Sequence, residues 1–178
     1  ARFEELLFDP ETVLGLVPGQ WVREAVIDID PTSTLHPAVT GHDQYIRELV
    51  QLLRETGLEP VVIYSSARDG IHIRLPLPEA IQPNRLGHTL RSLLEEEGYT
   101  LAPGQLEVYP TPRQNYAPHG EARDWTQQSV CRLAAQPGCR DFATGMAIAP
   151  TDWPSRFEAA AEDVQWQRFR QRVEAQVA

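Results

Sequence analysis

The chain has 178 residues, of which 42% are hydrophobic, and a formal charge of −9. This length suits one buried core and is short for two, so we expect residues 1–178 to form a single domain. The negative charge excludes a surface that is basic all over, as in proteins that coat nucleic acid through charge alone. All 16 basic residues are Arg, whose planar guanidinium favours phosphate and carboxylate partners.

The cysteine content and the hydropathy pattern restrict the compartment. Two cysteines, Cys131 and Cys139, are too few for a disulfide framework, and no apolar run has the roughly 18 to 20 residues of a membrane span. The first ten residues lack the pattern of a signal peptide. We therefore expect a soluble, cytoplasmic protein without a membrane partner. The chain begins with Ala rather than Met, which leaves open that it is part of a longer protein.

The first predicted elements are a strand and a helix. Residues 21–30 (WVREAVIDID) end in strict alternation of apolar and polar side chains, which is typical of a half-buried strand. After a Pro- and Thr-rich loop, residues 42–56 place apolar side chains at helical spacing. Gly57 then stands where a helix commonly ends, so this segment predicts the first helix.

A hairpin, a second helix and a further strand follow. The β-branched run 60–65, the turn 67–70 and the alternating run 71–75 predict the hairpin. Residues 83–98 carry Leu at helical spacing and predict the second helix. Residues 105–109 (QLEVY) alternate again and predict the fourth strand.

The resulting order is strand, helix, strand, strand, helix, strand. It is typical of the split βαβ arrangement of ferredoxin-like and RNA-recognition-like folds, an α+β class, and we expect helices on one face of the sheet only. Residues 111–150 are rich in Pro, Gly, Gln and Arg and predict irregular structure, apart from a short strand at 129–133. Residues 153–177 predict one C-terminal helix. Its apolar stripe contains Phe157, Val164, Phe169 and Val173.

Alternation assigns the strand side chains to two faces. The residues expected to meet the helices are Ile27, Ile29, Ile71, Ile73, Leu106 and Val108. The residues expected on the opposite, open face are Asp28, Asp30, His72, Arg74, Glu107 and Tyr109. In the split βαβ topology the first and third strands are central and the fourth lies beside the first. Three carboxylates, a histidine and an arginine should therefore converge.

Three close carboxylates repel one another, which raises their pKa values unless a cation lies between them. Oxygen ligation by Asp28, Asp30 and Glu107 favours Mg²⁺ or Mn²⁺ over zinc. The basic side chains that would then meet a polyphosphate are Arg68, His72 and Arg74. This pattern is typical of two-metal phosphoryl transfer. The alternative is an ordinary solvated sheet face, since a D-x-D pair by itself is common.

At these positions the sequence resembles the catalytic core of the archaeo-eukaryotic primase superfamily, the primase-polymerases. That core carries an acidic h-D-h-D strand, a motif of S-x-H type and a third acidic motif on a split βαβ sheet. The matching segments here are IDID at 27–30, SSARDGIH at 65–72 and LEVYP at 106–110. The resemblance spans about residues 21–140, and it extends to the polymerase domains of bacterial end-joining ligases.

The resemblance implies a nucleotidyltransferase that adds nucleotides from nucleoside triphosphates to a DNA or RNA strand. Asp28, Asp30 and Glu107 would be its catalytic residues and hold the metals. Ser66 and His72 would bind the triphosphate, and Arg132 would also contact phosphate, beside the Arg68 and Arg74 inferred above. The implied partners are a template-primer and a fused or associated helicase, ligase or other replication or repair domain.

Aromatic and basic residues interleave in the polar loop that follows, and they are Arg113, Tyr116, Arg123 and Trp125. Such residues can stack on template bases or equally cover the sheet. Zinc is not expected, because Cys131, Cys139 and His119 lack both the C-x-x-C spacing and an evident fourth ligand.

Two alternative functions are compatible with the same predicted sheet. One is a non-catalytic nucleic-acid-binding module, whose central strand positions usually hold aromatic residues. Here those positions hold Asp28, Asp30 and His72, which disfavours that function. The other is a metal-dependent nuclease or phosphohydrolase that uses the same acids.

Overall fold

The computed structural model describes residues 5–6, 9, 14–16, 19–65, 68–111, 131–132 and 138–176. Its strands are β1 (Gly15–Leu16), β2 (Val22–Ile29), β3 (Val61–Tyr64), β4 (Ile71–Ile81), β5 (Leu106–Tyr109), β6 (Cys131–Arg132) and β7 (Arg140–Asp141). Its helices are α2 (Pro37–Thr40), α3 (Gln44–Glu55), α4 (Pro83–Glu96), α5 (Trp153–Asp163) and α6 (Trp166–Ala175), with a 3₁₀ turn at Pro150–Asp152. Among the described residues, no helix combines the length and the apolar character needed to cross a membrane.

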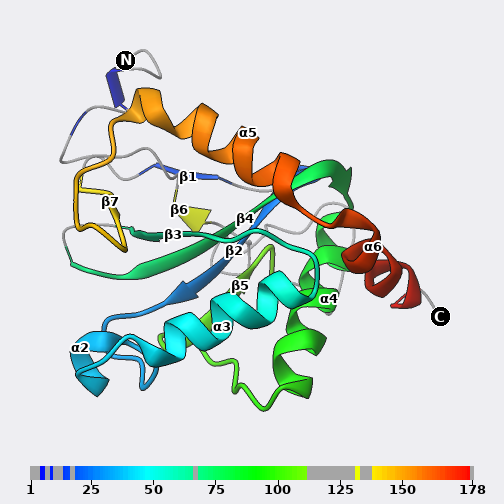
Figure 1. The fold of residues 1–178 in the computed structure, drawn as a ribbon, viewed down its shortest axis with the longest axis horizontal. Helices are drawn as coiled ribbons and strands as arrows, with labels where there is room; N and C mark the ends of the chain where they lie inside the picture. Colours follow the sequence, from blue (N-terminus) through cyan, green and yellow to red (C-terminus); the bar gives the residue numbers. More distant parts are fainter. Residues whose placement is uncertain are drawn as a thin grey trace, which may run out of the picture.

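Five strands form one antiparallel sheet in the order β5-β2-β4-β3-β7 (Figure 1). Strands β3 and β4 are the predicted hairpin, β2 pairs with β4, and β5 lies on the other side of β2. The predicted neighbours of these four strands are therefore confirmed. Strand β7 extends the sheet by two residues beside β3, and β1 pairs separately with β6. The α+β class is thus shown.

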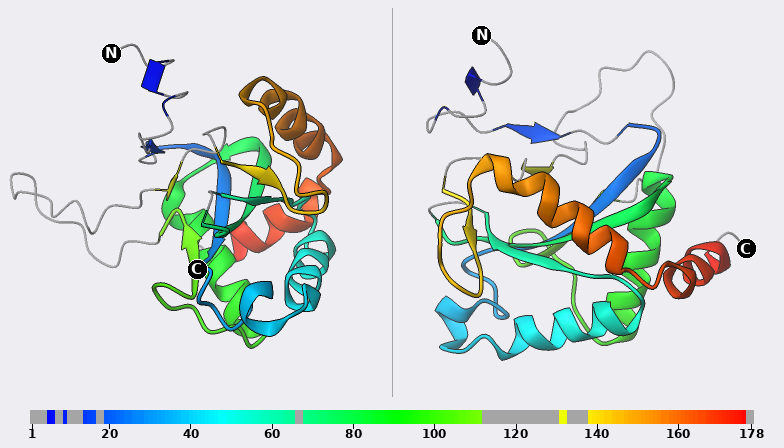
Figure 2. Two further views of the ribbon diagram at one scale, coloured as in Figure 1. Left: turned by 90° about the vertical axis from the view of Figure 1, so that its left-hand side faces the viewer. Right: turned by 45° about the horizontal axis from the view of Figure 1, so that its top comes forward.

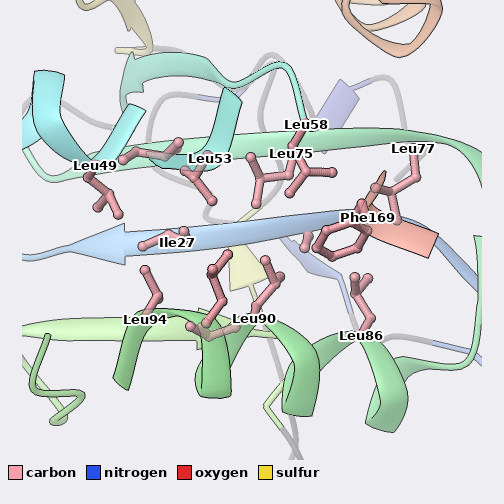
Figure 3. Close-up of a cluster of buried hydrophobic side chains, with 14 of the residues drawn as sticks. Ile27, Leu49, Leu53, Leu58, Leu75, Leu77, Leu86, Leu90, Leu94 and Phe169 are labelled. Atoms are coloured by element: carbon pink, nitrogen blue, oxygen red, sulfur yellow. The ribbon is translucent and has the colours of Figure 1, made fainter. Parts of the chain in front are cut away.

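The main core lies between one face of the sheet and the helices α3, α4 and α6 (Figure 3). The six strand residues predicted to face the helices are all buried, with exposed fractions between 0% and 6%. They meet Leu49 and Leu53 from α3, Leu90 and Leu94 from α4, and Phe169 from α6. Helical spacing gives each helix one apolar side, and burying these sides on the sheet holds the layers together.

The opposite face of the sheet is partly covered by α5, so the prediction of helices on one face only is wrong. Figures 1 and 2 show α5 and α3 on opposite sides of the sheet. Ile63 of β3 is fully buried in a second cluster, which includes Trp153 and Phe157 of α5. Trp153 and Phe157 are four residues apart and stack with their ring centres 5.0 Å from each other. This pair gives α5 an apolar side that fits over Ile63.

The single helix predicted for residues 153–177 is also wrong. The chain leaves helical geometry at Val164, whose φ of −69° and ψ of 134° are extended, and α6 begins at Trp166. The break divides the predicted stripe, because Phe157 packs in the second cluster while Phe169 and Val173 pack in the main core. The C-terminal segment therefore crosses from one face of the sheet to the other.

Candidate functional site

Polar residues on three adjacent strands form one transverse row. Asp28 of β2 lies directly opposite His72 of β4 and opposite Glu107 of β5. Side chains at directly opposed positions of antiparallel strands have Cβ atoms about 4.5–5.5 Å apart. Asp30 follows two residues later and so continues the same face. The structure therefore brings together the three carboxylates and the histidine that alternation predicts for one face.

Asp28 is the most perturbed carboxyl group of this row. Burial raises the pKa of Asp28 from 3.8 to about 7, with further increases from the charges of Asp30 and Glu107 and an opposing hydrogen bond from a backbone N–H at Ile29. The Asp28 side chain is 23% exposed, and its Oδ1 lies 3.5 Å from His72 Nε2. A carboxyl group with this pKa is only partly ionised at neutral pH, so a nearby cation would stabilise its charged form.

A backbone N–H orients the carboxylate of Glu107 on β5. Glu107 Oε2 accepts a hydrogen bond of 3.2 Å from the backbone N–H of Gly104, in the turn before the strand. The same turn is bonded to the loop after β2, because the backbone N–H of Asp30 donates to the carbonyl of Gln105. The first and third acidic segments are thus joined near the site as well as along the strands.

Arg74 has a different environment from the one expected. It is 2% exposed, and its guanidinium donates two hydrogen bonds to the Glu24 carboxylate, at 2.5 and 2.9 Å. Its Cζ lies 5.8 Å from the centre of the Phe157 ring of α5, and its Nη1 lies 3.5 Å from Nδ1 of His72, which is 4% exposed. The expectation of a fully open face is therefore wrong on β4. For Arg74 to meet a polyphosphate, its pair with Glu24 would have to separate.

The row has the donor chemistry for a hard divalent cation, since its carboxylates offer only oxygen ligands. Among the residues that the structure describes, no three His, Cys, Asp or Glu side chains are already arranged to hold a metal ion. The repulsion felt by Asp28 from Asp30 and Glu107 shows that the three groups are close enough to interact. Their chemistry fits Mg²⁺ or Mn²⁺, and binding would require side-chain adjustment.

Sequence reasoning missed His36, which contacts the turn between β3 and β4. His36 is 2% exposed, its Nδ1 accepts a 3.1 Å bond from the backbone N–H of Ala38, and its Nε2 lies 2.6 Å from the carbonyl oxygen of Asp69. Arg140 of β7 forms an ion pair with the Asp69 carboxylate and stacks over the ring of Tyr64. The His-Pro pair at 36–37, at the start of a short helix, was the available sequence signal.

Several predicted site residues are not placed. Ser66, Arg113, Tyr116, Arg123 and Trp125 lie outside the described residues. Arg132 is described only through its backbone, which pairs with Gly15, and Arg68 is exposed.

Of the three residues considered for zinc, the structure describes the side chain of Cys139. Cys139 is 2% exposed, and its Sγ lies 3.4 Å from the carbonyl oxygen of Ser65. His119 lies outside the described part of the chain, and Cys131 is described through its backbone alone.

A groove of about 980 Å³ lies elsewhere, between α3, the β3 edge and α5. Its arginines are each paired with an acid within the groove, as Arg47 with Asp43, Arg54 with Glu59 and Arg156 with Asp141. Asp28, His72 and Glu107 do not line it. It therefore offers no excess positive charge to a nucleic acid.

Comparisons with known proteins give a structural likeness of low score. No family model and no curated protein matches the sequence. The polymerase domain of Ligase D from Mycobacterium tuberculosis, solved in complex with DNA, is similar with a TM-score of 0.41 and 16% sequence identity. The match covers 84% of this chain and 58% of that chain, so this chain spans less than two thirds of the length of that domain. The function proposed below therefore rests on the site's own geometry.

Proposed function

We propose that this chain is a nucleotidyltransferase of the primase-polymerase type, which adds nucleotides from nucleoside triphosphates to a DNA or RNA strand. The observation that carries the proposal is the row of Glu107, Asp28 and His72 on three adjacent strands, with Asp30 on the same face. The observed strand order is also the one expected of a split βαβ core, which we propose as the fold.

The proposed chemistry depends on position and charge. Asp28, Asp30 and Glu107 would hold Mg²⁺ or Mn²⁺, which when bound supplies charge neutralisation for phosphate oxygens and activates a hydroxyl nucleophile. Cross-strand pairing keeps the backbone positions of the carboxylates and His72 in a fixed relation, so the adjustment on binding is confined to side chains. His72 Nε2 faces Asp28, where an N–H can orient a phosphate oxygen beside the carboxylates.

Nucleotide and template contacts complete the proposal. The nucleotide contacts would come from Ser66, Arg68, His72, Arg132 and, once released from Glu24, Arg74. Residues 111–140 carry four arginines and two acids, which makes them the net-positive stretch of an acidic chain. Arg113, Tyr116, Arg123 and Trp125 would contact the template from there. Binding to nucleic acid should be weak and salt-sensitive, because few positive charges are available.

Primer extension tests the proposal. The protein is incubated with a labelled primer-template, nucleoside triphosphates and Mg²⁺ or Mn²⁺, and compared with the double variant Asp28→Ala with Asp30→Ala. Asp163→Ala, at an exposed acid that ends α5, is the matched control. We expect the double variant to lose about 1000-fold or more of the incorporation rate and the control to lose little.

Two outcomes would overturn the proposal. The first is equal incorporation by the wild type and the double variant. The second is degradation of the labelled strand with metal but without nucleotides, if it is abolished by the same double variant, because it would identify a nuclease that uses the same carboxylates.

A further inference from the structure

The loop after β2, residues 30–36, spans the ends of the three strands that carry the row. At one end, the backbone N–H of Asp30 donates to the carbonyl of Gln105, and the backbone N–H of Thr34 lies 3.3 Å from Gln105 Oε1. At the other end, the side chain of His36 reaches Asp69, in the turn before β4. The loop thus connects the turn before β5 with the turn before β4.

The contacts of His36 determine its tautomer. A backbone N–H can only donate, so the bond from Ala38 requires an unprotonated Nδ1. A carbonyl oxygen can only accept, so the 2.6 Å contact with Asp69 requires a proton on Nε2. The imidazole is buried in this position, and both of its nitrogens are used. His36 therefore caps α2 with one nitrogen and holds the β3–β4 turn with the other.

In the described part of the turn that His36 holds, Asp69 has a backbone conformation that the surrounding contacts have to maintain. Asp69 adopts a φ of 62°, which is uncommon for a residue with a side chain. The backbone N–H of Ser65 donates to the carbonyl of Gly70 at 2.7 Å and closes the turn. A Cβ at Gly70 would come within 3.1 Å of Ser65 Oγ. His72 lies only three residues beyond Asp69, so the position of this turn sets where β4 begins relative to the row.

We propose that His36 is a positioning residue, which fixes the Asp69 turn and thereby places His72 beside Asp28. The catalytic consequence rests on the function proposed above, whereas the structural role does not. Loss of the Asp69 contact should loosen the turn and weaken nucleotide binding through His72. The chemical step should change less, because Asp28 and Glu107 are held by β2 and β5.

Two substitutions separate the contacts of His36. The amide nitrogen of Gln reaches about as far as Nε2, so His36→Gln should keep the bond to Asp69. The amide oxygen of Asn stands near the place of Nδ1, so His36→Asn should keep the cap on Ala38 and lose Asp69. His36→Ala loses both contacts. His42→Ala, at an exposed histidine near the same loop, is the control.

Amide hydrogen exchange at Ser65 reports the turn directly, and primer extension reports its consequence. We expect exchange at Ser65 to be about tenfold faster in His36→Asn and His36→Ala, and near the wild-type rate in His36→Gln and His42→Ala. KM for the nucleotide should rise about tenfold in the same two variants, with kcat within about threefold. A ¹⁵N spectrum of the wild-type imidazole should show the proton on Nε2.

The outcomes separate the two proposals. Wild-type exchange at Ser65 in His36→Asn, or a proton on Nδ1 in the wild type, would overturn the role of His36. If the wild type incorporates no nucleotide with either metal, the proposed function fails, and the exchange rates still decide whether His36 holds the turn. Slower exchange in His36→Gln than in His36→Asn would support the contact with Asp69.

Discussion

On the face of the sheet covered by α3, α4 and α6, β2 and β4 present fully buried aliphatic side chains, such as Ile27 and Ile73. The residues adjacent to these two in sequence, Asp28 and His72, point to the other face and lie opposite each other on the paired strands. Helix α5 covers this second face at Ile63 of β3 and at Arg74 of β4. A step of one residue along a strand therefore separates the side chains that stabilise the fold from those that can do chemistry.

The largest stability effect should come from the apolar face. Leu90 of α4 is fully buried in the main core, so Leu90→Ala removes apolar contacts and leaves a cavity. We expect the free energy of unfolding to fall by about 2–5 kcal/mol, measured by urea denaturation. A loss below about 1 kcal/mol would show that this face is not the main source of stability.

A substitution on the polar face is expected to raise the free energy of unfolding instead of lowering it. Because the pKa of Asp28 is raised from 3.8 to about 7, the folded protein holds a proton that the unfolded chain releases above pH 4. Stability due to this group is therefore present at low pH and lost as the pH rises to about 7. Asp28→Asn removes that loss, so without metal it should stabilise the protein at pH 8 by up to about 4 kcal/mol.

The pH dependence identifies the cause of that gain. At pH 3.5 Asp28 is protonated in the folded state and mostly protonated in the unfolded chain, so Asp28→Asn and the wild type should unfold at similar urea concentrations. Asp163→Asn, at an exposed carboxyl, should have little effect at either pH. A gain from Asp28→Asn that is equal at pH 3.5 and pH 8 would contradict an origin in the buried charge.

The passage of the C-terminal segment from one face of the sheet to the other can be tested at Gly57, which contacts the break between α5 and α6. Gly57 has a φ of +96°, and a Cβ there would lie 2.5 Å from the carbonyl oxygen of Gln165, at the break between α5 and α6. Gly57→Ala should therefore cost about 2–3 kcal/mol of unfolding free energy. Gly98→Ala is the matched control, because its φ of +86° is similar and its Cβ would meet nothing within 4 Å. Equal losses would show that the close approach is unimportant.

The smallest effect expected is the stabilisation of the polar face by a cation. At ten times its Kd, Mg²⁺ or Mn²⁺ should stabilise the wild type by about 1.4 kcal/mol at pH 8, seen as a rise in Tm. The variant Asp28→Asn with Asp30→Asn should show no such rise, since two of the three ligands lose their charge. An equal rise in both proteins would place the cation elsewhere.

The local pattern of the chain was sufficient to predict most of the sheet. Strict alternation in β2 and β5 assigned Asp28 and Glu107 to one face, because the strand period of two has no freedom once the apolar side is buried. Helical spacing likewise predicted α3 and α4. The two-residue β7 was missed, since a segment of that length carries no measurable periodicity. The break at Val164 was missed because no Gly or Pro marks it.

Alternation along the strands is enough to separate two chemistries on one set of strands, since it depends only on neighbouring residues. The burial of particular polar groups and their choice of partners depend instead on how distant segments pack. The pairing of Arg74 with Glu24 joins residues 50 positions apart, and the contact of His36 with Asp69 joins residues 33 apart. The return of α5 over Ile63 likewise depends on the path of the chain. Such contacts follow from packing between distant segments, which local spacing does not encode.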